Sequence, residues 1–187
     1  MEETIVSINM AKTPGVHILS GRDIEDKRGW FWKAFEKDKL DRAGLSFSCQ
    51  EIFYSYSIEG VVRGMHYQGK PSASSKIVTC LTGHVLDVIL DLRRSSSRYG
   101  RAEAFWLDEY RKRSIFIPPG VAHGFYVKRG PAIMSYQTDM KYYADADFGI
   151  KWNSIPFDWP ISELEGVIES DRDKNLPLWE SFITPFE

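Results

Sequence analysis

The sequence predicts an all-β fold, a β-sandwich or jelly roll with short peripheral helices. Two observations carry this prediction. Short runs rich in β-branched and aromatic residues recur through the middle of the chain, and each is bounded by Gly, Pro or Ser. Helical patterning is confined to residues 30–44 and to a short stretch near residues 161–166. Many short strands with turns at short intervals are typical of sandwiches and jelly rolls.

The expected strands follow one another through the middle of the chain. The segment LTGH (81–84) is interpreted as a tight hairpin turn between two of them. The helix expected at WFWKAFEKDKLDRAG (30–44) ends in glycine, and a second is expected near ISELEG (161–166). The strand segments are CQEIFYSYSIEG (49–60), VVRGMHYQ (61–68), KIVTC (76–80), VLDVILDL (85–92), EAFWLDEY (103–110), RSIFIPPG (113–120), AHGFYVKRG (122–130) and AIMSYQTDM (132–140).

The strand expected at residues 85–92 carries apolar residues on both of its faces. Side chains alternate from face to face along a strand. Both faces are partly apolar, which predicts a strand that is buried between two layers. One face would carry Val85, Asp87, Ile89 and Asp91, and the other Leu86, Val88, Leu90 and Leu92.

Length and composition indicate a single folded domain over residues 1–187. The chain is 43% apolar and 14% aromatic, which argues against disorder, and its formal net charge of −2 favours no general affinity for nucleic acid or membrane. It has no apolar run of membrane-spanning length, and its first residues lack the apolar core of a signal peptide. Cys49 and Cys80 stand apart, without a CxxC pair. We therefore expect a soluble, cytoplasmic protein with free thiols.

Two of the four histidines lie in Gly-flanked strand contexts, His66 in RGMH and His123 in PPGVAHGF. Histidines of this kind are more often structural than functional. A metal site with His66, His123 and Asp87 as ligands is poorly supported, because the sequence has no HxH, HExxH or nearby Cys pair.

Metal-free acid–base chemistry is the alternative. Removing a proton beside a carbonyl needs a base such as histidine oriented by a carboxylate, and the enolate that forms needs a nearby positive charge. An acid such as tyrosine can return a proton on the opposite face. The chain offers His66, Lys76 and Tyr136 on separate strand-like segments, with carboxylates near the C-terminus. Composition and spacing alone do not distinguish these residues from ordinary strand and surface side chains.

Six segments in chain order resemble one known pattern, the dTDP-4-dehydrorhamnose 3,5-epimerase family of nucleotide-sugar epimerases. The resemblance extends from about residue 15 to residue 178, nearly the whole chain. The resemblance implies a jelly-roll cupin that needs no metal or other cofactor. It also implies a nucleotide-diphosphate sugar as substrate and a homodimer with exchanged β-segments and shared active sites. The segments are DKRGWFWKAF (26–35), VVRGMHYQ (61–68), KIVTCLTGHVLDVILDLRRSSSRYG (76–100), IFIPPGVAHGF (115–125), SYQTDMKYYADADFGIKWNS (135–154) and DWPISELEGVIESDRDKNLP (158–177).

The resemblance assigns a catalytic role to four residues of this chain. His66 matches the catalytic base, and Asp173 matches the carboxylate paired with it, although Asp171 is a near competitor for that place. Lys76 matches the lysine that stabilises the enolate oxygen. Tyr136 matches the tyrosine that returns the proton on the opposite face.

Five further residues match substrate-binding positions of the family. Arg63 and Arg28 match arginines that bind the nucleotide diphosphate, and Arg28 is expected to reach the site of a neighbouring subunit. A guanidinium fork fits a diphosphate bidentately. Phe31 and Gln50 match substrate contacts, and His123 is expected to line the pocket.

Strand geometry raises one conflict with this assignment. Arg63 and His66 are three residues apart, so they point to opposite faces of a strand unless the chain bulges at Gly64. The chain also departs from the family pattern at Lys33, Gln137, Lys141 and residues 51–60, all near expected nucleotide and sugar contacts.

Several functions remain open at this point. The favoured one is inversion of C3, C5 or both in a 4-keto-6-deoxy nucleotide sugar, with dTDP as the expected nucleotide. A related 3,4-ketoisomerase, a non-catalytic sugar-binding cupin and a metal-dependent oxygenase are the alternatives.

Overall fold

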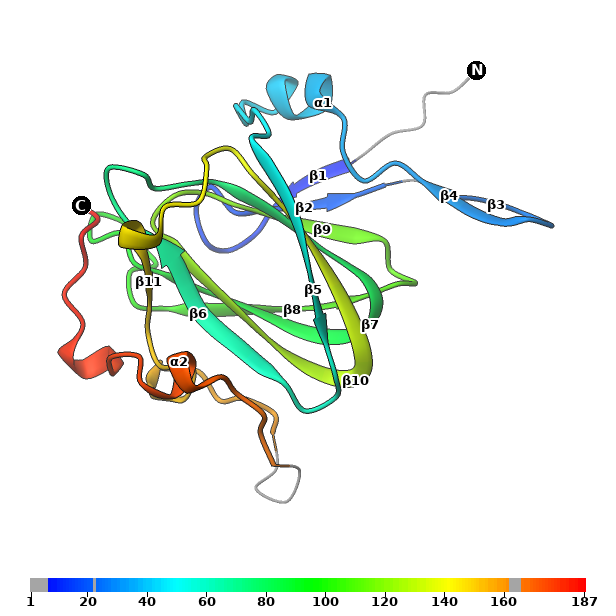
Figure 1. The fold of residues 1–187 in the computed structure, drawn as a ribbon. Coiled ribbons are helices and arrows are strands. Elements are labelled where there is room, and N and C mark those ends of the chain that lie inside the picture. Colours follow the sequence, from blue (N-terminus) through cyan, green and yellow to red (C-terminus); the bar gives the residue numbers. More distant parts are fainter. Residues whose placement is uncertain (1–6, 22, 162–165) are drawn as a thin grey trace.

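The structure, a computed structural model, describes residues 7–21, 23–161 and 166–187 (Figure 1). Within these ranges a nine-stranded antiparallel sheet folds into a sandwich, and a separate two-stranded hairpin projects from it. The all-β prediction is confirmed. The strands are β1 (Ser7–Met10), β2 (His17–Ser20), β3 (Asp23–Asp26), β4 (Gly29–Trp32), β5 (Glu51–Ser57), β6 (Val62–Gln68), β7 (Lys76–Asp91), β8 (Ala102–Asp108), β9 (Arg113–Ile117), β10 (Val121–Thr138) and β11 (Asp147–Gly149).

The two longest strands, β7 and β10, pair along their whole length and take part in both layers of the sandwich. In the first layer, the early part of β7 pairs with β9, and the late part of β10 pairs with the edge strand β5. In the second layer, the late part of β7 pairs with β8, and the early part of β10 pairs with β6. The layers are therefore two halves of one bent sheet.

The interpretation of residues 81–84 as a hairpin turn is wrong, because the chain bends there but continues as one strand. Val78 and Val85 both face the core between the layers, although they are seven positions apart in the chain and strict alternation would put them on opposite faces. The irregularity at the bend makes this possible. Gly83 has φ +87°, and a Cβ there would lie 2.8 Å from the Pro131 carbonyl oxygen. The bend thus needs glycine, and it carries β7 from one layer into the other.

The segments expected as separate strands at 122–130 and 132–140 likewise form one strand, β10. Its pairing with β7 is irregular between Val127 and Met134, opposite the bend at Gly83. The two strands therefore bend together.

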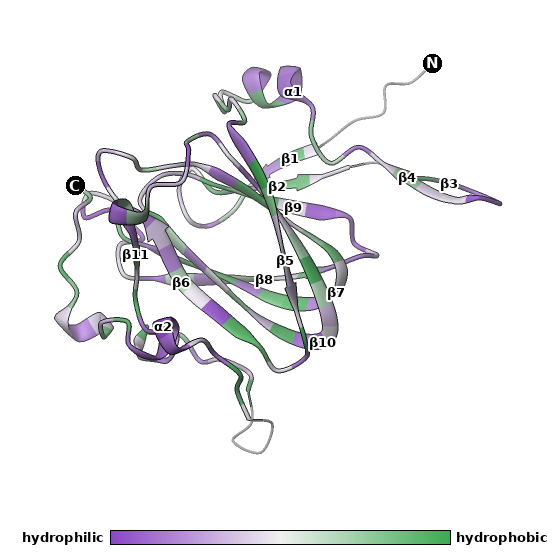
Figure 2. Ribbon diagram, viewed as in Figure 1, coloured by the Kyte–Doolittle hydropathy of each residue, from purple (hydrophilic) through white to green (hydrophobic). Residues whose placement is uncertain are grey.

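Residues 85–92 are buried on both faces, as the sequence predicts. Val85 and Ile89 face the core between the layers, with residues such as Phe125 and Met134. The other face packs under the C-terminal part of the chain. That outer cluster includes Leu86, Val88, Leu90, Leu92, Ile150, Trp152, Trp159 and Phe186. In Figure 2, the strands of the sandwich accordingly contain stretches of hydrophobic residues, drawn in green.

The helix expected at residues 30–44 is only partly correct. Trp30 and Phe31 lie in the β3–β4 hairpin, and only α1 (Lys37–Arg42) is helical. Leu40 is buried in a third cluster, on the outer face of the first layer with Leu19 and Phe116. The pairing of β4 with β3 therefore overrides the helical pattern at residues 30–32.

The second expected helix, at residues 161–166, lies mostly outside the described residues. In the described ranges, the remaining helical elements are α2 (Asp171–Lys174) and three single 3₁₀ turns at Ala144–Ala146, Trp152–Ser154 and Trp179–Ser181. In the described part of the chain, no helix is long and apolar enough to span a membrane.

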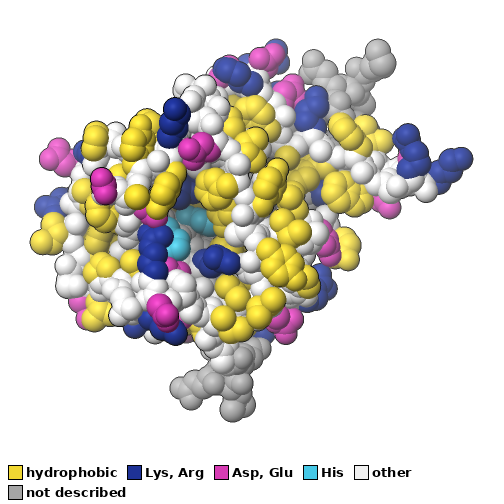
Figure 3. Space-filling view, viewed as in Figure 1, with side chains coloured by type: hydrophobic (Ala, Val, Ile, Leu, Met, Phe, Trp, Pro, Cys, Tyr) yellow, Lys and Arg dark blue, Asp and Glu magenta, His cyan; other side chains and the backbone are white. Residues whose placement is uncertain are grey.

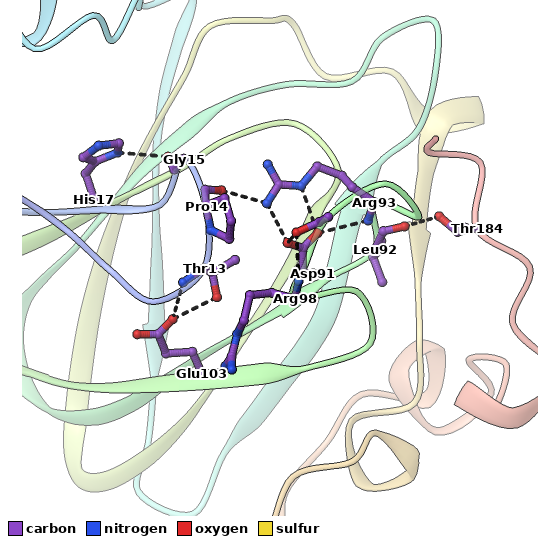
Figure 4. A network of polar contacts seen from close by, with 11 residues as sticks. Thr13, Pro14, Gly15, His17, Asp91, Leu92, Arg93, Arg98, Glu103 and Thr184 are labelled. Carbon is purple, nitrogen blue, oxygen red and sulfur yellow. Dashed lines mark hydrogen bonds and ion pairs between the residues drawn. The ribbon is translucent and has the colours of Figure 1, made fainter.

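Two carboxylates anchor the loop before β2 to the second layer (Figure 4). Glu103 accepts hydrogen bonds from the backbone N–H and the hydroxyl of Thr13, both 2.8 Å long. Asp91 is fully buried and pairs with Arg93 at 2.6 Å, and Arg93 also donates to the carbonyl of Pro14. Burial alone would raise the pKa of Asp91, but the hydrogen bonds from Arg93 and Ser96 outweigh it and lower the pKa. This network is structural and lies apart from the pocket described below.

Candidate active site

A pocket of about 290 Å³ opens between the two layers of the sandwich. That volume is close to the lower end of the range for small-molecule sites. The first layer contributes Phe53, Lys76 and Tyr136 to its wall, and the second contributes Arg63, His66 and His123. In Figure 3, histidine is visible at the bottom of a hollow flanked by Lys and Arg side chains.

A β-bulge brings Arg63 and His66 to the same pocket. On β6, two residues separate them, whereas only one residue separates their partners His123 and Phe125 on β10. Gly64 is the residue that permits this: its φ is +111°, and a Cβ there would lie 2.6 Å from the Cα of Gly124. The conflict raised by simple strand alternation is thereby resolved.

The same bulge frees a donor for the carboxylate of Asp173. The Gly64 N–H donates to Asp173 Oδ2 at 3.0 Å, and His66 Nε2 lies 2.8 Å from Asp173 Oδ1. Ser170 caps α2 by accepting a hydrogen bond from the Asp173 N–H, which fixes the helix that carries Asp173. Asp171 instead is exposed and pairs with Lys174. The structure thus brings Asp173, and not Asp171, against His66.

The carboxylate of Asp173 is ionised in this setting. Burial alone would raise its pKa, but the hydrogen bonds from His66 and Gly64 and the charge of Arg172 outweigh burial and lower it. An ionised carboxylate only accepts hydrogen bonds, so His66 Nε2 carries the proton that it shares with Asp173. In the neutral imidazole, Nδ1 of His66 is then the nitrogen with a free lone pair, as a general base requires.

Lys76 stands at the start of β7 and lines the pocket. Burial lowers the pKa of its ammonium, and the negative charges of Asp147 and Asp87 oppose that change. A partly desolvated cation of this kind can stabilise a negative oxygen more strongly than a fully hydrated one.

Tyr136 lies on β10 in the first layer and is 8% exposed. Burial raises the pKa of its hydroxyl, so the side chain stays a protonated phenol at neutral pH. The His123 ring packs against it in a T-shaped arrangement, with the ring centroids 6.1 Å apart. The phenol and the His66 imidazole thus line one pocket from different layers.

His123 forms a second histidine–carboxylate pair, and its partner is Asp87. His123 Nε2 lies 2.7 Å from Asp87 Oδ2, and the Asp87 side chain is fully buried. His66 and His123 are thus each engaged in a separate histidine–carboxylate pair. Among the described residues, no group of three or more His, Cys, Asp or Glu side chains is arranged to hold a metal ion.

The pocket rim carries two arginines. The Arg63 guanidinium donates to the Ser57 hydroxyl at 2.9 Å, which holds it against β5. Arg172, which directly precedes Asp173 in the sequence, pairs with Asp147 at 2.9 Å. With Lys76, these side chains make the pocket suitable for an anionic ligand.

Three residues expected to contact substrate lie away from this pocket. The Gln50 side chain is exposed and bonds the Ser48 carbonyl, whereas its neighbour Glu51 lines the pocket. Arg28 and Phe31 belong to the projecting β3–β4 hairpin (Figure 1). Arg28 is 84% exposed in its side chain and pairs with Asp26.

Sequence reasoning overlooked three residues that line the pocket, Phe53, Asp147 and Arg172, and it missed the role of Asp87 as the partner of His123. One signal could have found Asp87. It shares a strand face with Val85 and Ile89, and a carboxylate on an apolar face requires a buried partner. Phe53, Asp147 and Arg172 have no comparable signal, since their positions depend on pairing between distant segments.

Comparison with known proteins supports one family. The family model described as dTDP-4-dehydrorhamnose 3,5-epimerase matches residues 10–181. The chain is 36% identical over 173 residues to the dTDP-4-dehydrorhamnose 3,5-epimerase of Shigella flexneri, covering 90% of this chain and 94% of that protein. It is 33% identical over 170 residues to the enzyme of the same name from Methanothermobacter thermautotrophicus, with 89% and 91% covered.

A solved structure agrees with these sequence matches. The crystal structure of dTDP-6-deoxy-D-glucose-3,5-epimerase from Legionella pneumophila, in complex with dTDP-4-keto-L-rhamnose, superposes with a TM-score of 0.91. The two sequences are 28% identical, and the match covers 98% of this chain and 99% of the other.

Proposed function

The chain belongs to the dTDP-4-dehydrorhamnose 3,5-epimerase family of isomerases, and from that membership we propose its reaction. It inverts C3, C5 or both in a dTDP-linked 4-keto-6-deoxyhexose, without a metal ion. One observation carries the proposal: His66, Lys76 and Tyr136 line a single pocket, and Asp173 holds His66 from behind. All of residues 1–187 would form one domain, since side chains from residue 53 to residue 173 contribute to this one site.

The chemistry begins with a proton beside the ketone. His66 removes that proton, the C–H electron pair forms the carbon–carbon double bond of the enolate, and the carbonyl oxygen becomes negative. Lys76 stabilises the charged oxygen. Tyr136 then donates its hydroxyl proton to the same carbon from the opposite face. Solvent reprotonates the tyrosinate, and His66 releases the proton that it took from the sugar to solvent. The sugar is inverted at that carbon, and no atom is gained or lost overall.

Binding of the nucleotide diphosphate is assigned to the cations of the rim. Arg63 and Arg172 lie at the pocket mouth, where a guanidinium can contact phosphate oxygens bidentately. The 3,4-ketoisomerase alternative is less well supported, because the relatives reported above are all named as 3,5-epimerases.

Deuterium incorporation tests the proposed reaction. We expect the protein, pretreated with a chelator, to exchange deuterium from D₂O into C3, C5 or both of dTDP-4-keto-6-deoxyglucose. NMR of the product would report the labelled carbon and the inverted face together. A panel of such keto-sugars that stayed unlabelled with folded protein would refute the epimerase assignment. Activity that disappeared on chelation and returned with a metal ion would refute the metal-free mechanism.

A homodimer with shared sites would explain the outlying residues. The outer side of the edge strand β5 carries a row of exposed apolar side chains, Ile52, Tyr54 and Tyr56, and such a row is typical of an interface. Arg28 and Phe31 lie too far out on their hairpin to line the pocket of their own chain. In a dimer, they would line the pocket of the partner.

Complementation between two defective subunits tests this arrangement. We expect Arg28→Ala to raise KM about tenfold or more, the scale of a lost charged hydrogen bond, whereas Lys27→Ala on the same hairpin leaves KM unchanged. Mixed dimers of Arg28→Ala and His66→Ala subunits should contain one intact site, with wild-type KM. If Arg28 served its own subunit, neither site would be intact and mixing would restore nothing.

A further inference from the structure

Phe53 lies against Tyr136 on the neighbouring strand. The two residues are directly opposite each other in the pairing of β5 with β10, so their side chains share one face. Their ring centroids are 4.8 Å apart, and the ring planes differ by 11°. Phe53 is 46% exposed and Tyr136 only 8%, so the phenylalanine ring covers one face of the tyrosine ring.

Tyr136 has a second ring contact, which comes from within the sandwich. The His123 ring approaches Tyr136 from another side, with the planes at 70°. His123 in turn is held by the buried carboxylate of Asp87. Phe53 instead contacts Tyr136 from the edge strand β5, which among the described strands pairs only with β10. Fewer neighbouring residues therefore constrain Phe53.

We propose that Phe53 is a positioning residue: its stacking on Tyr136 sets the direction in which the phenol presents its proton. This inference rests on the proposed function. Proton abstraction by His66 does not require the stack. Delivery of a proton to the opposite face does, because the Tyr136 oxygen must lie in line with the enolate carbon.

The enolate has two fates, and they leave different products. If Tyr136 donates its proton, the carbon is inverted. If it does not, His66 returns the proton that it holds to the original face, and the carbon keeps its configuration. In D₂O the held proton exchanges with solvent, so the second fate gives labelled sugar without inversion. The ratio of inverted to labelled but uninverted sugar therefore reports the orientation of Tyr136.

The decisive variant is Phe53→Ala, assayed by NMR in D₂O. We expect the inverted-to-uninverted ratio to fall about tenfold or more, because small misplacements of a reacting group have effects of this size. Total deuterium incorporation should fall by much less, since His66, Asp173 and Lys76 are untouched. A purely structural role for Phe53 would lower both quantities together.

Three variants complete the test. Phe53→Tyr retains a ring for stacking and should keep the wild-type ratio, whereas Phe53→Leu should lower the ratio, since it fills space without a ring. Tyr110→Ala removes an aromatic side chain that is 72% exposed on the β8–β9 turn, and it should change nothing. If Phe53→Ala does not fold, Phe53→Leu carries the test.

The outcomes separate this inference from the proposed function. A wild-type protein that neither labels nor inverts the sugar overturns the proposed function, and this inference with it. A wild-type protein that inverts the sugar, with an unchanged ratio in folded Phe53→Ala or Phe53→Leu, overturns the role of Phe53 alone.

Discussion

Replacing His66 with alanine or asparagine is expected to lower both deuterium exchange and inversion by ~10²- to 10⁴-fold, the usual contribution of a positioned general base. His66 is the pocket group whose free ring nitrogen can take the substrate proton, because its other nitrogen is engaged by the ionised Asp173. Both readouts should fall together, since no enolate forms without the base. The measurement is NMR in D₂O on protein whose folding is checked by thermal melting.

The two neighbouring aspartates provide a matched control for that result. Asp173→Asn removes the charge that orients His66 and should also lower the rate. Asp171→Asn alters an exposed carboxylate that pairs with Lys174 and should leave the rate unchanged. Near-normal exchange in a folded His66→Ala protein would exclude His66 as the base. An equal effect of the two aspartate variants would exclude a specific role for Asp173.

Replacing Lys76 with methionine is expected to lower kcat by ~10²- to 10³-fold, the scale of losing one group that stabilises a developing oxyanion. Methionine keeps much of the length and apolar bulk of the side chain but has no charge. Lys70→Met, an exposed lysine in the preceding loop, is the matched control and should retain wild-type kcat.

The pH profile gives a second readout for Lys76. Burial lowers its pKa, so it loses its proton at a lower pH than an ordinary lysine does. The wild-type rate should therefore decline on the alkaline side as the ammonium is neutralised, and Lys76→Met should lack that decline. A Lys76→Met enzyme with normal kcat, or with an unchanged alkaline limb, would contradict the role assigned to Lys76.

Much of the sandwich could be predicted from local sequence. The apolar residues on both faces of 85–92 correctly predicted a strand buried on both sides, because period-two patterning depends only on neighbouring residues. The prediction of a turn at residues 81–84 was wrong, because the path of the chain there depends on pairing with a distant segment. A glycine with positive φ is compatible with a chain reversal and with a bend. Here β10 pairs with both halves of β7, so the chain bends and does not reverse.

The helical prediction failed in a similar way. Residues 30–32 have a pattern compatible with a helix, but they pair with β3 in the hairpin. Propensity is a weak prior that such pairing overrides.

The sequence by itself determined the fold class, because strand patterning is local. It also predicted the chemical groups, through the resemblance of the motifs around His66, Lys76, Tyr136 and Asp173 to those of a known family. Only the tertiary structure decided how these groups meet. The bulge at Gly64 directs Arg63 and His66 into one pocket, and it exposes the N–H that helps to hold Asp173. The pairing of β5 with β10 sets Phe53 on Tyr136. Contacts of this kind depend on register between segments far apart in the chain, and register is fixed by the packing of the whole sandwich.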